Sequence, residues 1–179
     1  FDLRHYYQEP ACFVENYLKM NIARYEFVRD DRVFRNEISI WLGTAFETSM
    51  LGQDVIFQAN EDPYNSIKPV INEPADLERL SLPDFFTSGM MPLAHRLYNG
   101  CLERVDGQLS VLFPDWTRGP FSTATFLRGF EGLLVDLLLE PEFAHRLFDF
   151  ITKARFHWYD QKERYTGISR TMANLYNDE

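Results

Sequence analysis

The sequence predicts an α/β protein built around a parallel sheet. Three short apolar runs, at residues 38–42, 109–113 and 171–176, have the length and composition of buried strands. Long segments with apolar residues at helical spacing separate these runs, and strands that are joined through helices pair in parallel. The 179 residues, 45% of them apolar, are enough for one domain with a sizeable core.

Composition excludes several classes of function. The net charge of -9 argues against nucleic acid as a partner, because phosphate contacts need a basic surface. No apolar run approaches the roughly 18 residues of a membrane span. Two cysteines do not make a disulfide framework, which favours a reducing interior over secretion. We therefore expect a cytoplasmic protein that binds neither nucleic acid nor membranes. No stretch of the given residues has the pattern of a signal peptide, and the start at Phe1 is compatible with a processed, trimmed or incomplete N-terminus.

The first elements follow from periodicity. Residues 10–30 alternate an apolar stripe with a polar face at helical spacing, within an N-terminal helical segment that we assign to residues 1–36. Residues 37–42 form the first strand, which ends at Gly43 and Thr44. Residues 46–51 then form a helical turn that ends at Gly52, a C-cap residue.

A small β-hairpin is predicted next. Residues 54–58 and 68–71 have the composition of two short strands, and the turn formers of residues 60–65 lie between them. Residues 72–80 begin a helix, because a polar cap, a proline and early acids suit a helix N-terminus. Residues 90–105 form an amphipathic helix whose apolar stripe includes Leu93, Leu97, Cys101 and Val105.

The second β/α unit is the most informative part of the chain. Its strand, residues 109–113, passes through a polar turn rich in glycine and proline into one long apolar helix. The motif Glu140-Pro141-Glu142 begins a further long helix, which ends near Gly167 and precedes the third strand. Three parallel strands do not close a barrel, which needs about eight strands and typically about 250 residues. The predicted domain therefore looks unfinished.

Four blocks of sequence resemble the uroporphyrinogen decarboxylase superfamily. They are residues 38–52, the hairpin leading to residues 74–80, residues 119–129, and residues 140–142 with the following helix. This superfamily includes the decarboxylase of haem biosynthesis and methyltransferases that serve corrinoid proteins and coenzyme M. The resemblance implies the N-terminal part of a (β/α)8 TIM-type barrel, with about three parallel core strands, helices and a small β-hairpin. Residues 37–179 would be the first part of that barrel.

Departures from the family pattern bear on the reaction. Family decarboxylases carry an aspartate after the first strand and a tyrosine in the second unit; these positions fall at Gly43 and Phe126. The decarboxylases also hold substrate carboxylates with two N-terminal arginines. No equivalent is found before Glu37, where the arginines are interpreted as helix-surface charges: Arg24, Arg29, Arg32 and Arg35. We therefore expect a methyltransferase-like enzyme more than a true decarboxylase.

The methyltransferase branch of the family uses zinc. Zinc lowers the pKa of a thiol so that the thiolate attacks a methyl group. The family's ligands, a His-x-Cys pair and a distant cysteine, lie in the later half of the barrel. Cys12 and Cys101 fall on helical stripes, as buried structural cysteines do, and the histidines show no ligand spacing: His5, His95, His145 and His157. No cofactor is assignable in this chain, and zinc is expected only in the missing C-terminal part.

The candidate site residues follow from the rule that barrel enzymes act at the C-terminal ends of their strands. After the first strand the rule selects Thr44 and Glu47; Glu47 is either a catalytic carboxylate or a solvated helix acid. After the second strand it selects Asp115 as the other catalytic candidate. Substrate binding is assigned to Trp116, Arg118 and Ser122.

Each of these roles has a structural alternative. Arg118 can bind a carboxylate bidentately beside an apolar wall formed by Trp116, or pair with Asp115 to stabilise its own loop. Ser122 and Thr123 can donate to an anion or cap their helix. Arg128 and Glu131 are expected on the helix exterior. The acids and amide that follow the third strand are either site residues or a frayed end: Asn177, Asp178 and Glu179.

Three functions remain open. The first is a portion of a methyltransferase-like enzyme that acts on a small molecule or a corrinoid protein; the second is a divergent lyase of porphyrin metabolism. The third is a non-catalytic half-barrel subunit. An open three-stranded sheet leaves an unpaired edge and an apolar face. We therefore expect the chain to need the C-terminal remainder of the barrel or a partner subunit, and to be inactive alone.

Overall fold

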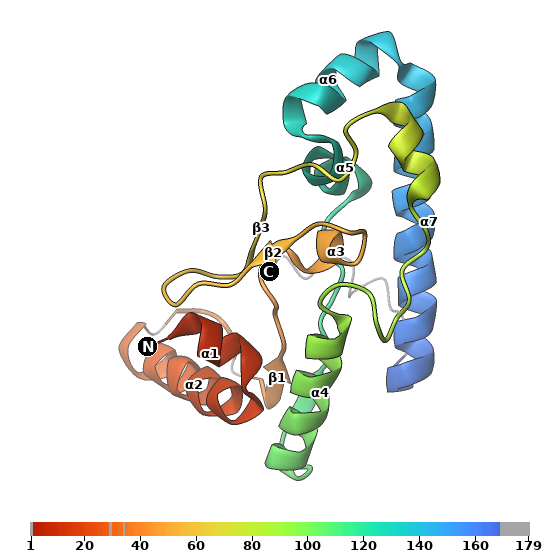
Figure 1. Cartoon of the computed structure of the whole chain (residues 1–179). Helices are drawn as coiled ribbons and strands as arrows, with labels where there is room; N and C mark the ends of the chain where they lie inside the picture. Colours follow the sequence, from red (N-terminus) through yellow and green to blue (C-terminus); the bar gives the residue numbers. More distant parts are fainter. Residues whose placement is uncertain (1, 29, 34, 169–179) are drawn as a thin grey trace.

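The structure is a computed structural model that describes residues 2–28, 30–33 and 35–168 (Figure 1). The predicted third strand at residues 171–176 lies outside the described residues. The same holds for Arg29 and for the candidates Asn177, Asp178 and Glu179.

Two helices precede the first strand. They are α1 (Leu3–Gln8) and α2 (Pro10–Ala23), and α2 continues into a π-helical turn (Arg24–Val28). The predicted single helix over residues 10–30 is therefore wrong at its C-terminal end, where the α-helix gives way to the wider turn. Phe13 of α2 stacks on Tyr6 of α1 at 4.7 Å between ring centroids, and α2 packs along α4 (Met91–Val105).

A two-stranded parallel sheet forms the centre of the fold. Strand β1 (Glu37–Ser39) pairs with β4 (Ser110–Leu112), with Ile38 opposite Val111. Ile38 and Val111 are buried under the helices, whereas Ser39 on the opposite face of β1 is exposed. The α/β class and two parallel strands thus agree with the sequence prediction; the described residues form an open sheet and not a closed barrel.

The hairpin differs from its prediction. A short helix, α3 (Phe46–Ser49), leads to β2 (Val55–Ile56), whose antiparallel partner is β3 (Tyr64–Asn65). The second strand is therefore not at residues 68–71. Those residues leave the hairpin because the side chain of Gln53 donates to the carbonyl oxygens of Ser66 (2.7 Å) and Lys68 (2.9 Å).

The second unit contains two helices where one was predicted. Helix α5 (Pro120–Arg128) ends at Gly129, whose φ of 82° starts α6 (Phe130–Leu139) in a new direction. The expected exterior position of Arg128 is also wrong. Its Nε donates to the buried Asp136 carboxylate at 2.6 Å, and its Nη1 donates to the Asn72 carbonyl at 2.6 Å.

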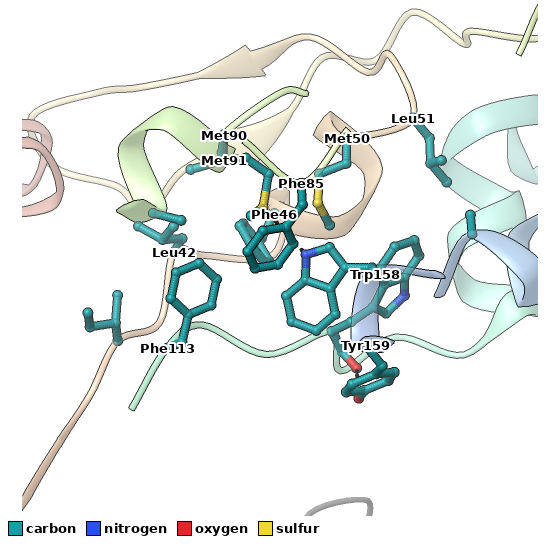
Figure 2. Packing of buried hydrophobic residues seen from close by; sticks show 14 of the residues in the cluster. Leu42, Phe46, Met50, Leu51, Phe85, Met90, Met91, Phe113, Trp158 and Tyr159 are labelled. Atoms are coloured by element: carbon teal, nitrogen blue, oxygen red, sulfur yellow. Dashed lines mark hydrogen bonds between the residues drawn. The ribbon is translucent and has the colours of Figure 1, made fainter. Parts of the chain in front are cut away.

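The long helix α7 (Pro141–Thr166) runs along one side of the molecule, with α5 and α6 at one of its ends (Figure 1). The segment Pro74–Arg79 is a 3₁₀ helix. Between α3, α4 and α7 lies the main core, in which Trp158 packs against Phe46 and donates from Nε1 to the Met91 sulfur at 3.4 Å (Figure 2). No helix among the described residues is both long and apolar enough to cross a membrane.

Candidate functional site

The loops that follow β1 and β4 meet at one end of the sheet. Because the two strands are parallel, their carboxyl ends lie at the same edge, where α/β enzymes place their chemistry. Helix α3 follows the first strand, and residues 113–119 connect the second strand to α5. The contact between these segments is made by the side chain of Glu47.

Glu47 is the buried carboxylate of this end of the fold, with only 1% of its surface exposed. Its Oε1 accepts hydrogen bonds from the Thr117 amide (2.7 Å), the Thr117 hydroxyl (2.9 Å) and the Arg118 amide (3.1 Å). The alternative of a solvated helix acid is therefore wrong. Hydrogen bonds to an ionised acceptor are the strong ones, so Glu47 fixes the loop after β4.

Arg118 is held from several sides. Its Nε donates to the Thr44 carbonyl at 3.0 Å and lies 3.8 Å from Glu47 Oε2, while Nη1 donates to the Ser122 hydroxyl at 3.1 Å. The guanidinium carbon lies 4.4 Å from the centroid of the Phe126 ring. Within the described part of the chain, no hydrogen bond reaches Nη2. A planar, oriented guanidinium with a remaining donor edge is suited to an anionic group.

Asp115 does not pair with Arg118. Its Oδ1 accepts from the Trp116 amide at 2.8 Å and lies 3.2 Å from the ammonium nitrogen of Lys162 on α7. The predicted ion pair within the loop is thus replaced by two separate pairs, one from Asp115 to Lys162 and one from Arg118 to Glu47.

Trp116 is a core residue in this structure. It is 0% exposed, its indole nitrogen donates to the Arg118 carbonyl at 3.1 Å, and its own carbonyl accepts from the Tyr159 hydroxyl at 2.9 Å. An enclosed ring presents no surface to a ligand, so the predicted apolar wall is not formed by Trp116. The aromatic surface beside Arg118 belongs to Phe126, which lies four residues after Ser122 on the same face of α5.

Ser122 and Thr123 are not caps of α5. No side chain caps this helix at Gly119. Ser122 accepts the bond from Arg118, whereas the hydroxyl of the buried Thr123 donates to the Gly119 carbonyl at 3.1 Å. Ser122, and not Thr123, therefore lies beside the Arg118 guanidinium.

Gly43, four residues after the end of β1, has no room for a side chain. Its φ is 80°, and a Cβ atom at this position would lie 2.6 Å from the carbonyl oxygen of Pro63 in the hairpin loop. The loop occupies the place where a carboxylate at position 43 would project. The site thus offers neither that carboxylate nor a hydroxyl at Phe126.

Two cavities lie near the N-terminal helices. The larger, about 650 Å³, is lined by residues that precede β1, including Arg24, Arg32 and Arg35. Arg24 pairs with Asp30, and Arg35 lies 3.6 Å from Glu37. This cavity is at the amino end of β1, opposite to the loops that carry Glu47 and Arg118. The second cavity lies between α1, α2 and the face of β1 that carries Ser39.

The described residues do not fit a zinc centre. Among them, no group of three His, Cys, Asp or Glu side chains is arranged to hold a metal. A zinc-bound cysteine is a thiolate, whereas burial on α4 raises the pKa of the Cys101 thiol to about 11. Cys12 on α2 accepts a hydrogen bond from Asn16 of the same helix at 3.4 Å.

Comparison with known proteins shows which family and which fold this chain resembles. A family model described as uroporphyrinogen decarboxylase (URO-D) matches residues 36–158. None of the curated proteins matches the chain. Among solved structures, a methyltransferase from Methanosarcina mazei superposes with a TM-score of 0.63 at 14% identity, over 89% of this chain and 44% of its own. Identity this low shows a shared fold alone, and this chain spans less than half of that methyltransferase's length.

Proposed function

This chain belongs to the uroporphyrinogen decarboxylase (URO-D) family, and we propose that it forms part of a methyltransferase-like member of the superfamily. The observation that carries the proposal is the closed position at Gly43, where the Pro63 carbonyl leaves no space for a side chain. The family resemblance assigns the pyrrole-binding aspartate of the decarboxylases to this position. Phe126 likewise lacks the hydroxyl of the decarboxylase tyrosine.

In the proposed enzyme, Arg118 binds an anionic group of the methyl acceptor. Support comes from the fixed guanidinium, which is held by Thr44, Ser122 and the Phe126 ring and keeps Nη2 for a ligand. A charge-assisted hydrogen bond from Nη2 to an anionic group is stronger than a bond between neutral groups, and the fixed guanidinium sets its direction. Glu47 acts as the positioning residue of this loop, because its carboxylate binds the amides of residues 117 and 118.

Asp115 is retained as the second candidate acid of the site. It is half-buried, and its Oδ1 lies 3.2 Å from the ammonium nitrogen of Lys162. Since the described residues do not fit zinc, no step through that metal is assigned to them.

The partners proposed for this chain are the C-terminal remainder of the barrel or a separate subunit that supplies it. Support comes from the open two-stranded sheet and from the 44% coverage of the Methanosarcina mazei methyltransferase. A small-molecule acceptor and a corrinoid protein are the proposed substrates. A cytoplasmic location is proposed because both cysteines are free thiols.

The second candidate function is a divergent decarboxylase. The arginine-lined cavity before β1 favours it, since Arg32 and its neighbours are suited to substrate carboxylates. Against it stands the position of the cavity at the amino end of β1, because barrel enzymes act at the opposite end of their strands.

Two assays on the complete protein separate these functions. The first follows methyl transfer from methylcobalamin to 2-mercaptoethanesulfonate through the absorbance of the cobalamin. The second follows loss of carboxyl groups from uroporphyrinogen by chromatography. The proposal expects turnover in the first assay alone. Turnover in the second alone would establish the lyase, and a folded complex that is inactive in both would favour the non-catalytic subunit.

A further inference from the structure

The residues that line the cavity between the N-terminal helices and β1 have no role in the proposed methyl transfer. Its volume is about 290 Å³, and its walls come from α1, α2, the segment after β1 and the hairpin loop. Aromatic rings dominate the lining, together with one carboxylate: Tyr6, Tyr7, Phe13, Tyr17, Trp41 and Asp62. We propose that this cavity binds a small organic ammonium ion, such as a methylated amine.

Trp41 is the aromatic ring that is open to a ligand. It lies two residues after the end of β1, and 46% of its surface is exposed. Tyr7 packs against it edge to face, at 6.4 Å between ring centroids, and is itself buried. Organic cations bind to the faces of aromatic rings, and tryptophan gives the strongest attraction. The contact with the buried Tyr7 ring holds the exposed Trp41 ring in place, so that Trp41 can present a face to a ligand.

Asp62 supplies a negative charge to the same cavity. The Tyr7 hydroxyl donates to Asp62 Oδ1 at 2.7 Å, which orients the carboxylate. Burial and this hydrogen bond raise the pKa of the Tyr7 phenol, so Tyr7 remains a neutral donor. No ion pair with Asp62 forms within the part of the chain that the structure describes. Asp62 is exposed at the rim of the cavity, so a cationic ligand in the cavity can pair with its carboxylate while water still reaches it.

The packing on Gly43 explains why Asp62 lies there. Because Gly43 has no side chain, the backbone of Pro63 approaches the segment that follows β1. The neighbouring Asp62 thereby lines the same cavity as Trp41. The hairpin is also tied to α1, since the Leu3 amide donates to the Ala59 carbonyl at 2.8 Å. The walls of the cavity are thus fixed by contacts between segments that are far apart in the sequence.

Charge and size narrow the class of ligand. An anion would meet the Asp62 carboxylate on a chain with a net charge of -9. A neutral apolar molecule has no charge to pair with the Asp62 carboxylate, so it would use only the aromatic part of the cavity. A cavity of about 290 Å³ is at the lower end of the range of ligand sites, so the ligand is small.

Choline and its uncharged isostere 3,3-dimethylbutan-1-ol test the proposal, because they differ only in the quaternary centre. Calorimetric titration of the full chain is expected to show saturable choline binding, about tenfold tighter than binding of the alcohol. Trp41→Leu is expected to remove most of the choline affinity. Asp62→Asn is expected to weaken choline binding about tenfold while leaving the weak binding of the alcohol unchanged.

Glu61→Gln is the matched control, since Glu61 is an exposed acid in the same loop that does not line the cavity. Asp62→Asn retains an oxygen that can accept from Tyr7, so it keeps the fold even if Trp41→Leu does not. Equal affinity for choline and the alcohol, equal effects of the Asp62 and Glu61 variants, or no saturable choline binding to the folded chain would each overturn the proposal. None of these results depends on methyl transfer.

Discussion

Replacing Glu47 with alanine tests the account of the loop after β4. In the wild-type chain one carboxylate oxygen accepts three hydrogen bonds from Thr117 and Arg118, and the second oxygen lies 3.8 Å from the Arg118 Nε. Glu47→Ala removes the acceptor of these donors, and the carboxylate that is lost is itself 1% exposed.

The expected loss of stability follows from the burial of this group. Removing one partner of a buried ion pair destabilises a protein by about 3 to 5 kcal/mol. For a chain of this size, 1 kcal/mol corresponds to about 2 to 4 °C in melting temperature, so the loss is roughly 6 to 20 °C. Glu47→Gln keeps an acceptor for the amides and loses only the charge, so we expect a smaller loss of about 1 to 2 kcal/mol.

Thermal unfolding followed by circular dichroism measures both variants. Glu103→Ala on the exposed side of α4 is the control, and its free energy of unfolding is expected to stay within about 0.5 kcal/mol of the wild type. A melting temperature for Glu47→Ala equal to that of the Glu103 variant would refute the reasoning, because it would mean that the loop does not depend on this carboxylate.

Three further predictions concern packing and titration. Gly43→Ala should destabilise the chain by about 3 kcal/mol or more in urea unfolding, because the position has a positive φ and a Cβ there clashes with backbone. Gly107 has a positive φ but nothing within 4 Å of a Cβ, so Gly107→Ala should cost only about 1 to 2 kcal/mol. Equal losses of stability in the two variants would contradict the clash at Gly43. At pH 8 a thiol reagent should label the half-buried Cys12 well before the buried Cys101, whose pKa is raised to about 11, as mass spectrometry would show; equal rates would contradict the burial of Cys101. Hydrogen bonds from the amides of Asn72 and Glu73 lower the pKa of Asp76. Its contribution to stability is therefore present above the unfolded pKa of about 3.9 and is lost as pH falls through the lower folded value. Asp76→Asn should make the free energy of unfolding less dependent on pH below this range, and parallel pH curves for the variant and the wild type would argue against this role.

The strands could be predicted from the sequence because their signal is local. Ile38 and Val111 lie in short apolar runs bounded by turn residues, and both are buried in paired strands. The error at residues 68–71 has a non-local cause. Gln53 binds the carbonyls of Ser66 and Lys68 through its side chain, and no periodicity reports such a contact.

The sequence predicted where the candidate site lies better than it predicted what each of its residues does. The rule of strand ends selected Glu47 and Arg118, which the structure brings together although they are 71 residues apart. It did not reveal that Trp116 is enclosed, because that depends on Tyr159 of α7. Phe126 was noted for its missing hydroxyl, but its contact with the Arg118 guanidinium required the geometry of α5.

The break at Gly129 could have been read from the sequence, since a glycine inside an apolar helical pattern is a possible helix end. The ion pair between Arg128 and Asp136 could not. These residues are eight positions apart, on different helices, and they meet only because the chain turns between them.

The central claim is that the loop held by Glu47 presents Arg118 to the anionic group of a methyl acceptor. Calorimetric binding of 2-mercaptoethanesulfonate to the complete protein tests it most directly. Arg146→Ala is the control, because Arg146 lies in an exposed surface pair with Glu78. The account predicts that Arg118→Ala weakens binding by at least about tenfold and that Arg146→Ala leaves it unchanged. Equal affinity of the wild-type protein and the Arg118 variant would contradict the account.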